Sequence, residues 1–262
     1  MNDAFFIAAT GMRAHQGGLD VIANNLVNAN TPGFKKSTIA FSEIVSSSID
    51  TQEMDVTEQV NSLGSSRVNS GVLLAGPQKQ FDMGDLKKTD NPLDIAIRGE
   101  GFIEVVLPGG KTAYSRGGAL KIGKDGVLMN ASGFPLKAGV QIPENTNDIS
   151  FSPDGKILIQ ANKQAGWNEV GQLNLIRFNN ASSLQQIGSD LFIQTTESGD
   201  PQVISQGDTS TEIAQGWLEM SNVKMLDEMM NMMLAQRAYE ASLKVLQAAD
   251  EMSAMANNLR KG

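Results

Sequence analysis

The first thirty residues place apolar and small side chains, and one histidine, at spacings that alternate between three and four. The positions are Phe5, Ala8, Met12, His15, Leu19, Ile22, Leu26 and Ala29. This spacing predicts a coiled-coil helix over Phe5–Ala29, about 36 Å long at about 1.5 Å per residue. The stripe is too narrow to enclose a core by itself, so this helix needs a partner helix.

The other end of the chain offers that partner. Val223–Leu259 contains no Gly or Pro, Ser221 or Asn222 can cap its start, and Asp227 and Glu228 bring negative charge to its first turn. One apolar row comprises Met225, Met229, Met232, Tyr239, Leu243 and Leu246, and a second comprises Ala235, Ala238, Val245, Ala249, Met252, Ala256 and Leu259. One N-terminal helix covers only one row, so we expect the other to contact further copies of the chain.

Between these helices, short apolar segments alternate with turn residues. Pro108–Gly110, Lys124–Gly126 and Pro153–Gly155 suit tight reversals. The candidate strands are Asp94–Ile97, Phe102–Leu107, Thr112–Ser115, Val127–Met129, Lys156–Ile159, Gln172–Phe178 and Leu191–Gln194. The predicted fold class is therefore α+β, with long N- and C-terminal helices paired as a coiled coil and a central all-β domain.

Ser42–Gly71 differs from both regions. It is rich in Ser, Thr, Asn and Gln, carries several acidic residues and shows little periodicity, so we expect an extended or disordered stretch. The predicted domains are an N-terminal coiled-coil helix at 1–34, an extended or flexible stretch at 35–75, a β-rich domain at 76–213 and a C-terminal coiled-coil helix at 214–262.

Composition argues against several classes of function. The formal net charge of −8 and the lack of a basic cluster disfavour nucleic-acid binding, and the pairs Lys35–Lys36 and Lys87–Lys88 are expected to be solvated. With no cysteine and one histidine, a multi-ligand zinc site is excluded and no cofactor is expected. The apolar run Ala4–Ala9 is too short for a secretory signal, so no cleaved signal peptide is expected.

Three local patterns that suggest chemistry have simpler explanations. Gly118–Lys124 matches most of a phosphate-binding loop, but Asp125 replaces the required Ser or Thr and a strand follows, so we expect a β-hairpin. His15 lies on the helical seam without a suitably spaced carboxylate, which favours a packed or interfacial role. The methionines of Met220–Met233 favour adaptable interface packing over metal binding. We select no catalytic residue and expect no enzyme activity.

The predicted end of the first helix is unusually rich in asparagine. Pro32 cannot extend a helix, Gly33 can adopt a positive φ, and Phe34 can dock the outgoing chain. The asparagines, four in seven positions, are Asn24, Asn25, Asn28 and Asn30. They exceed what a helix end needs, so we expect them to form hydrogen bonds between closely packed helices.

Several stretches resemble the signatures of the flagellar rod and hook protein family. They are Ala23–Leu26 and Thr31–Lys35 at the N-terminus, Leu93–Phe102 and Tyr114–Gly118 in the β-rich region, and Ser221–Val223, Glu228, Gln236–Glu240, Lys244 and Asp250–Met252 at the C-terminus. The resemblance covers nearly the whole chain. The overall length is similar to that of the distal rod members of the family.

This resemblance implies a structural subunit of the distal rod, whose paired terminal helices line a helical tube that transmits torque to the hook. It also implies export through the flagellar type III apparatus without cleavage, and a place in the basal body across the periplasm. The implied partners are further copies of the chain, proximal rod proteins, the hook protein and hook–rod junction, and the surrounding peptidoglycan and outer-membrane rings. The predicted subunit interface comprises Phe5, Met12, Leu19, Ile22, Asn24, Asn25, Leu26, Asn28, Phe34, Met229, Gln236, Arg237, Tyr239, Leu243 and Leu246.

Two alternative functions stay open at this point. A sibling rod or hook subunit is one, and deletion of Ser42–Gly71 distinguishes it, because stiffness or curvature should change in a distal rod. A β-domain that binds a ligand or carbohydrate on a coiled coil is the other. It predicts a discrete oligomer by light scattering instead of a concentration-dependent polymer.

Overall fold

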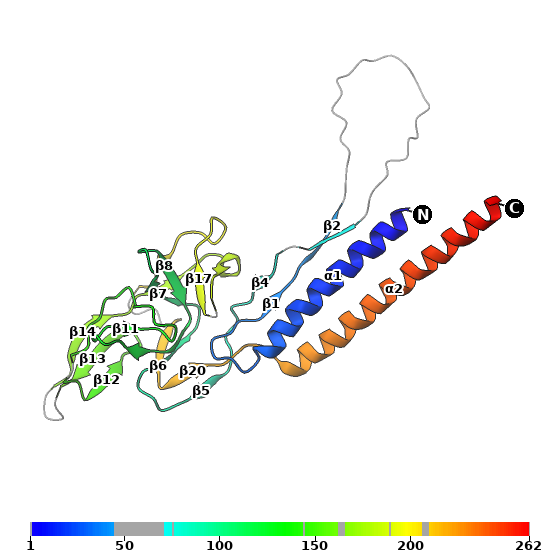
Figure 1. Cartoon of the computed structure of the whole chain (residues 1–262). Helices are drawn as coiled ribbons and strands as arrows, with labels where there is room; N and C mark the ends of the chain where they lie inside the picture. Colours follow the sequence, from blue (N-terminus) through cyan, green and yellow to red (C-terminus); the bar gives the residue numbers. More distant parts are fainter. Residues whose placement is uncertain are drawn as a thin grey trace, which may run out of the picture. The chain divides into compact units, whose positions relative to one another are not determined.

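The computed structural model describes residues 2–44, 71–74, 76–143, 145–161, 166–188, 190–205 and 210–261. The chain divides into two units (Figure 1). The first unit comprises Met1–Asn24, Ile39–Pro77 and Leu226–Gly262, and the second comprises Asn25–Thr38 and Gln78–Met225. The long helices lie mainly in the first unit, and most strands lie in the second.

Two long helices account for most of the first unit. Helix α1 spans Asn2–Val27 and helix α2 spans Met225–Lys261, so both expected helices are confirmed with ends within three residues of the prediction. Asp227 and Glu228 lie in the first turn of α2, as expected. In the part of the chain that the structure describes, neither helix is long and apolar enough to cross a membrane.

The predicted seam of α1 is a face that the fold covers. From Ala8 to Ile22 its positions are buried or half-buried. On α2, the covered positions also follow spacings of three and four, at Met232, Ala235, Tyr239, Ser242, Leu246 and Ala249. A Cβ added to Gly11 of α1 would lie 3.9 Å from Ser242 Oγ, so the two helices approach each other at this point.

A short antiparallel pair also belongs to the first unit. Strand β2 (Phe41–Ile44) pairs with β3 (Gly71–Leu74), with Phe41 opposite Leu74. These strands lie at the two ends of the Ser42–Gly71 stretch, which are therefore extended, as expected. Residues 45–70, the remainder of that stretch, lie outside the described residues.

The second unit is built from short strands. Their bounds are Ser37–Thr38 (β1), Gln78–Lys79 (β4), Leu86–Lys88 (β5), Asp94–Arg98 (β6), Phe102–Val106 (β7), Thr112–Ser115 (β8), Gly117–Ala119 (β9), Lys121–Ile122 (β10), Leu128–Met129 (β11), Asp148–Phe151 (β12), Lys156–Gln160 (β13), Asn168–Gln172 (β14), Leu175–Arg177 (β15), Gln185–Gln186 (β16), Leu191–Ile193 (β17), Gln202–Val203 (β18), Glu212–Gln215 (β19) and Trp217–Glu219 (β20). A short 3₁₀ helix, η1, spans Ala181–Ser183.

All the strand pairs described are antiparallel. The largest sheet has the order β16-β17-β8-β7-β15-β18, and two three-stranded sheets have the orders β12-β13-β14 and β19-β6-β9. The pairs β1-β4, β10-β11 and β5-β20 complete the unit. Because β4 follows β1 by forty residues and β20 follows β5 by well over a hundred, these pairs bring together the segments through which the chain enters and leaves the unit.

Two hydrophobic clusters form the core of this unit. The larger one gathers aliphatic side chains from several sheets, and Ile97, Leu128 and Ile157 in it are completely buried. The smaller one is aromatic and contains Phe102, Tyr114, Ile176, Phe178, Leu184 and Phe192, with Phe81 packed against it. Its rings meet edge to face, an arrangement that adds specific attraction to apolar burial.

Six of the seven expected strands are confirmed. They correspond to β6, β7, β8, β11, β13 and β17. Gln172–Phe178 is wrong as a single strand, because Gln172 ends β14 while Leu175–Arg177 forms β15 in a different sheet. The hairpin expected around Gly118–Lys124 is confirmed, since Lys121 pairs with Met129 across β10 and β11.

Candidate assembly site

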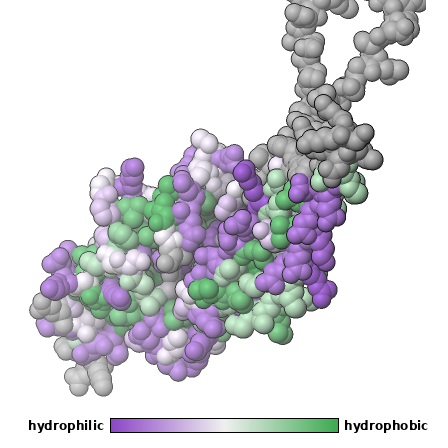
Figure 2. Space-filling model, turned by 45° about the vertical axis from the view of Figure 1, so that its right-hand side comes forward, coloured by the Kyte–Doolittle hydropathy of each residue, from purple (hydrophilic) through white to green (hydrophobic). Residues whose placement is uncertain are grey.

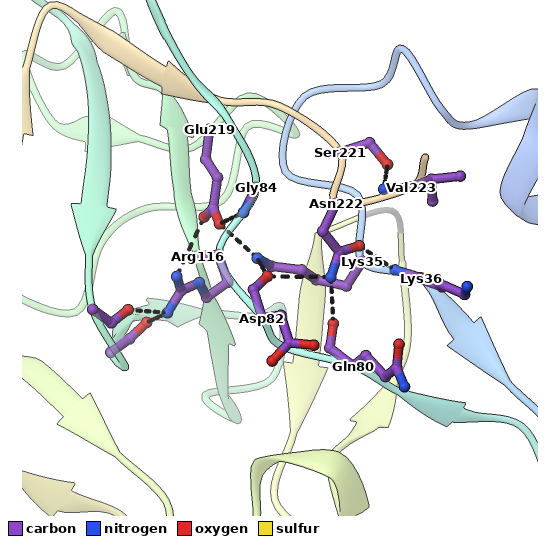
Figure 3. Close-up of polar contacts among 12 residues, drawn as sticks. Lys35, Lys36, Gln80, Asp82, Gly84, Arg116, Glu219, Ser221, Asn222 and Val223 are labelled. Atoms are coloured by element: carbon purple, nitrogen blue, oxygen red, sulfur yellow. Dashed lines mark hydrogen bonds and ion pairs between the residues drawn. The ribbon is translucent and has the colours of Figure 1, made fainter. Parts of the chain in front are cut away.

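The segment that follows α1 and the segment that precedes α2 meet at a buried carboxylate. Glu219 Oε1 accepts hydrogen bonds from Lys35 Nζ at 2.6 Å and from the backbone N–H of Gly84 at 3.0 Å. Glu219 Oε2 accepts a bond from Arg116 Nη2 at 3.3 Å (Figure 3). We call Lys35, Arg116 and Glu219 the ionic clamp.

The two cations of the ionic clamp are also fixed by backbone carbonyls. Lys35 Nζ donates to the carbonyl oxygen of Asp82 at 2.8 Å. Arg116 Nη1 donates to the carbonyls of Gly99 and Gly101 at 2.9 and 2.8 Å, next to the start of β7. The ionic clamp therefore fastens both connecting segments to the sheets of the second unit.

The ionic clamp is almost completely removed from water. The side chain of Lys35 is 0% exposed, and those of Arg116 and Glu219 are each 3% exposed. Burial lowers the pKa of Lys35, Glu219 opposes this effect by its charge, and the Arg116 guanidinium adds to it. Because two buried cations share one buried anion, loss of Glu219 would leave both without a buried counter-charge.

Lys35 corrects one expectation from the sequence. Lys87 and Lys88 are exposed, as expected for solvated basic residues. Lys35 is buried instead, because its ammonium group finds the Glu219 carboxylate inside the protein. Lys36 is half-buried, so the solvated interpretation holds for only one of the two basic pairs.

Asn222 joins the same segments through its side-chain amide. Its Oδ1 accepts the backbone N–H of Lys36 at 2.7 Å, and its Nδ2 donates to the carbonyls of Gln80 and Asp82 at 2.9 and 3.1 Å (Figure 3). The expected helix cap at Asn222 is therefore wrong, since its amide binds neighbouring segments and α2 begins three residues later. Ser221 Oγ accepts the N–H two residues further on, also before the helix.

The end of α1 is held by Asn25, which is completely buried. Its Nδ2 donates to the carbonyl of Ser37 at 2.8 Å, and its Oδ1 accepts the N–H of Ser37 at 2.9 Å. These bonds run to the segment after the helix, which differs from the helix-to-helix bonding expected for Asn25. Gly33 has a φ of 74° and Phe34 is buried with Lys79 Nζ 4.4 Å from its ring centre, so the expected turn and docking are confirmed.

Replacing Asn25 with alanine is expected to lower the free energy of unfolding by about 2 kcal/mol, because the buried N–H and C=O of Ser37 would lose these partners. Urea denaturation of the full chain measures this change. Asn30→Ala is the matched control, because Asn30 is exposed and its loss is expected to cost less than about 0.5 kcal/mol. Equal effects of the two substitutions would contradict the role assigned to Asn25.

The residues predicted to form the subunit interface have different environments within one chain. Met12, Leu19, Ile22, Leu26, Asn28, Tyr239, Leu243 and Leu246 are half-buried, Asn25 and Phe34 are buried, and Asn24, Met229, Gln236 and Arg237 are exposed. Phe5 lies in α1, and its side chain is outside the described residues. His15 is half-buried on the seam, in agreement with the packed or interfacial role expected for it.

Helix α2 keeps a second apolar face exposed. Its exposed large apolar residues are Met225, Leu226, Met229, Met230, Met233, Leu234, Val245, Met252 and Met255. Figure 2 shows that hydrophobic side chains reach the surface of the molecule beside hydrophilic ones. Since apolar surface of this extent usually marks an interaction site, α2 offers a contact surface.

The ionic clamp holds the connecting segments in place, and the exposed apolar face of α2 is available for contact with another surface. In the described ranges, no group of three or more His, Cys, Asp or Glu side chains is placed to hold a metal ion. The ionic clamp is occupied by its own hydrogen bonds, and the exposed face of α2 carries apolar side chains that bind by burial.

Comparison with known proteins identifies the family. The model described as flagella basal body rod protein matches residues 6–35, that of the flagellar hook protein FlgE/F/G D1 domain matches 96–159, and that of the flagellar basal body rod FlgEFG protein C-terminal region matches 214–259. The flagellar basal-body rod protein FlgG of Buchnera aphidicola subspecies Baizongia pistaciae is 38% identical over 96% of this chain and 97% of its own. That of Borreliella burgdorferi is 36% identical over 100% of both chains. The chain belongs to the flagellar rod and hook protein family.

Within this family, the chain is a structural rod protein close to FlgG. The flagellar basal-body rod protein FlgF of Caulobacter vibrioides is also similar, at 29% identity over 97% of this chain. Proteins of this kind are components of the flagellar basal body, and family membership implies assembly with other rod and hook components. The resemblance noted in the sequence is thereby confirmed.

The signature stretches of the rod subunit supply most of the ionic clamp. Lys35 ends Thr31–Lys35, Arg116 lies within Tyr114–Gly118, and its carbonyl partners lie within Leu93–Phe102. Sequence reasoning missed the clamp as a site. Nothing local in the sequence connects Lys35 or Arg116 to Glu219, which follows them by 184 and 103 residues.

Proposed function

We propose that this rod subunit polymerises into the rigid tubular shaft of the distal rod, transmits torque to the hook and catalyses no reaction. The observation that carries this proposal is the apolar face of α2, which stays exposed in a single chain. A chain of a rod family with such a face gains stability when further copies cover it.

In the proposed polymer, α1 and α2 pair as a coiled coil along the inside of the tube, with the β-rich unit outside. The three-and-four spacing on both helices and the approach of Gly11 to Ser242 support this pairing. The exposed and half-buried residues of the predicted interface then contact other copies. Asn25 and Phe34, which are buried, contribute by shaping the end of α1.

Torque transmission also requires a stiff subunit. Bending is easiest where a chain passes from a helix into strands, unless those connections are bonded to the folded body. Here the connection after α1 and the connection before α2 share the ionic clamp and the Asn222 amide. These bonds hold both connecting segments to the folded body of the second unit, which supports the proposed stiffness of that unit.

Family membership supports the proposed surroundings. The partners are proximal rod proteins, the hook protein and hook–rod junction, and the peptidoglycan and outer-membrane rings around a shaft that spans the periplasm. Export through the flagellar type III apparatus, without a cleaved signal peptide, delivers the subunit.

Leu243→Asp and Leu26→Asp test the proposed polymer, because each places a charge on a half-buried seam. Each is expected to raise the concentration at which polymer first forms at least about tenfold. This factor corresponds to a loss of about 1.4 kcal/mol of binding free energy per contact. Light scattering and electron microscopy over rising concentration measure it.

The matched control is Gln247→Asp, which adds the same charge at an exposed polar position of α2. It is expected to assemble like the unaltered chain. Normal rods from both seam variants would refute the proposed placement of the seams, and an unaltered chain that never polymerises would refute self-assembly.

A further inference from the structure

Methionine dominates the exposed apolar face that α2 presents in the first unit. Among the described residues of the helix from Leu226 onward, eight large apolar side chains are exposed and five of them belong to methionine. The whole chain holds 13 methionines in 262 residues, so this face is strongly enriched. We call these five residues the methionine face: Met229, Met230, Met233, Met252 and Met255.

The methionine face lies on the open side of the helix. Its side chains are 49% to 59% exposed. At about 100° per residue, they fall opposite the covered positions Tyr239, Leu246 and Ala249. A small molecule dissolved in water therefore has access to the methionine face of a single chain.

Other methionines of the same chain provide an internal comparison. Met83 and Met225, which belong to the second unit, are 54% and 45% exposed. Four more are half-buried, namely Met12, Met129, Met220 and Met232. Because a dissolved oxidant must reach the sulfur, the exposed methionines are expected to react before these four.

Methionine differs from the other apolar side chains of this face in its chemistry. A peroxide oxidises a thioether, whereas leucine and valine offer no sulfur. The sulfur lone pair attacks one peroxide oxygen, the O–O bond breaks, an S–O bond forms and, after proton transfer, water leaves. The sulfur loses two electrons, which the peroxide gains, and the product is methionine sulfoxide, a polar side chain.

We propose that the methionine face is a site of oxidative modification, and that its oxidation by a peroxide prevents a free subunit from joining the polymer. The effect on assembly rests on the proposed function, in which further copies cover the exposed face of α2. That contact is stabilised by apolar burial. A sulfoxide oxygen buried there without a hydrogen-bond donor opposes it, and five side chains change together.

Assembly protects the same site. Once another copy covers the methionine face, a dissolved peroxide no longer reaches its sulfurs. Oxidation therefore acts on subunits that have not yet assembled and leaves the finished polymer intact. The block is reversible, because sulfoxide reductases convert methionine sulfoxide back to methionine.

Treatment of the full chain with hydrogen peroxide tests the inference. Peptide mass mapping is expected to find the added oxygen, about 16 Da per sulfoxide, on the methionine face before it appears on the four half-buried methionines. After removal of the peroxide, the treated chain is expected to need at least about tenfold more protein to polymerise, measured by light scattering. The two sulfoxide reductases, one for each epimer, should reverse this change. Polymer formed before treatment should keep its methionine face unoxidised.

A protected variant identifies the residues responsible. It carries Met229→Leu, Met230→Leu, Met233→Leu, Met252→Leu and Met255→Leu. Leucine is apolar and forms helix as well as methionine does, so the variant should polymerise with or without peroxide treatment. Met83→Leu is the matched control, because it removes an exposed methionine outside α2 and should leave assembly as sensitive to peroxide as in the unaltered chain.

Several results would overturn the inference. An oxidised chain that polymerises like the untreated one is such a result, and so is a protected variant that loses assembly on treatment. If the five substitutions themselves impair assembly, failure of the reductases to restore the oxidised unaltered chain overturns it instead. An untreated chain that never polymerises refutes the proposed function, and the peptide masses then still decide whether the methionine face is oxidised first.

Discussion

Glu219→Gln is expected to lower the free energy of unfolding of the second unit by about 3–5 kcal/mol. This is the usual cost of removing one partner of a buried ion pair, which leaves the other charge buried without compensation. Glutamine keeps the shape of the side chain and can still accept a bond from the Gly84 N–H, so the substitution isolates the charge. Without that charge, Lys35 and Arg116 lie buried with no buried anion. Urea denaturation of the full chain, followed by a signal from the β-rich unit, measures the loss.

Glu104→Gln is the matched control for this substitution. Glu104 Oε1 accepts from Lys137 Nζ at 2.8 Å in the same unit, but the lysine side chain is 50% exposed, so the loss is expected to stay within about 1 kcal/mol. Adding Lys35→Met to Glu219→Gln should recover part of the stability, because it removes one of the two uncompensated charges. A Glu219→Gln chain as stable as the Glu104→Gln chain would contradict the role of the ionic clamp.

The helices were predictable because their pattern is local and long. A spacing of three and four that persists from Phe5 to Ala29 has no strand interpretation, and Val223–Leu259 has no residue that breaks a helix. The role of Asn222 could not be predicted correctly, because several backbone groups compete for its side-chain amide. A helix cap would use the N–H groups of α2, whereas the fold offers groups of Lys36 and Gln80 instead. Only the tertiary structure decides such a competition.

The ionic clamp and the shortest strands could not be predicted, for a related physical reason. Lys35 and Glu219 are 184 residues apart in sequence, so neither residue carries a local pattern that points to the other. Strands of two or three residues, such as β1 and β20, are too short to show alternation and exist because a distant segment pairs with them. Gln172–Phe178 nearly alternates polar and apolar side chains, as a single strand does, but the chain changes sheet between Gln172 and Leu175.

Gly84→Ala is expected to destabilise the second unit by about 3 kcal/mol, near the upper end of the range for overpacking. An added Cβ would overlap the carbonyl oxygen of Met220 and lie 3.2 Å from the carbonyl carbon of Ser221. These are backbone atoms, which cannot rotate away as a side chain can. The segments cannot separate freely either, because the Met220 N–H donates to the Asp85 carbonyl at 2.8 Å and the Gly84 N–H donates to Glu219.

Gly166→Ala is the control, because an added Cβ there meets no atom within 4 Å and the residue has no positive φ. Its effect should stay within about 0.5 kcal/mol. The combination of Gly84→Ala with Glu219→Gln should cost less than the sum of the two, since both act on the same hydrogen-bonded connection. If Gly84→Ala matched Gly166→Ala, or if Gly84→Ala and Glu219→Gln added fully, the segments near residues 84 and 219 would not be held together by their hydrogen bonds within the second unit.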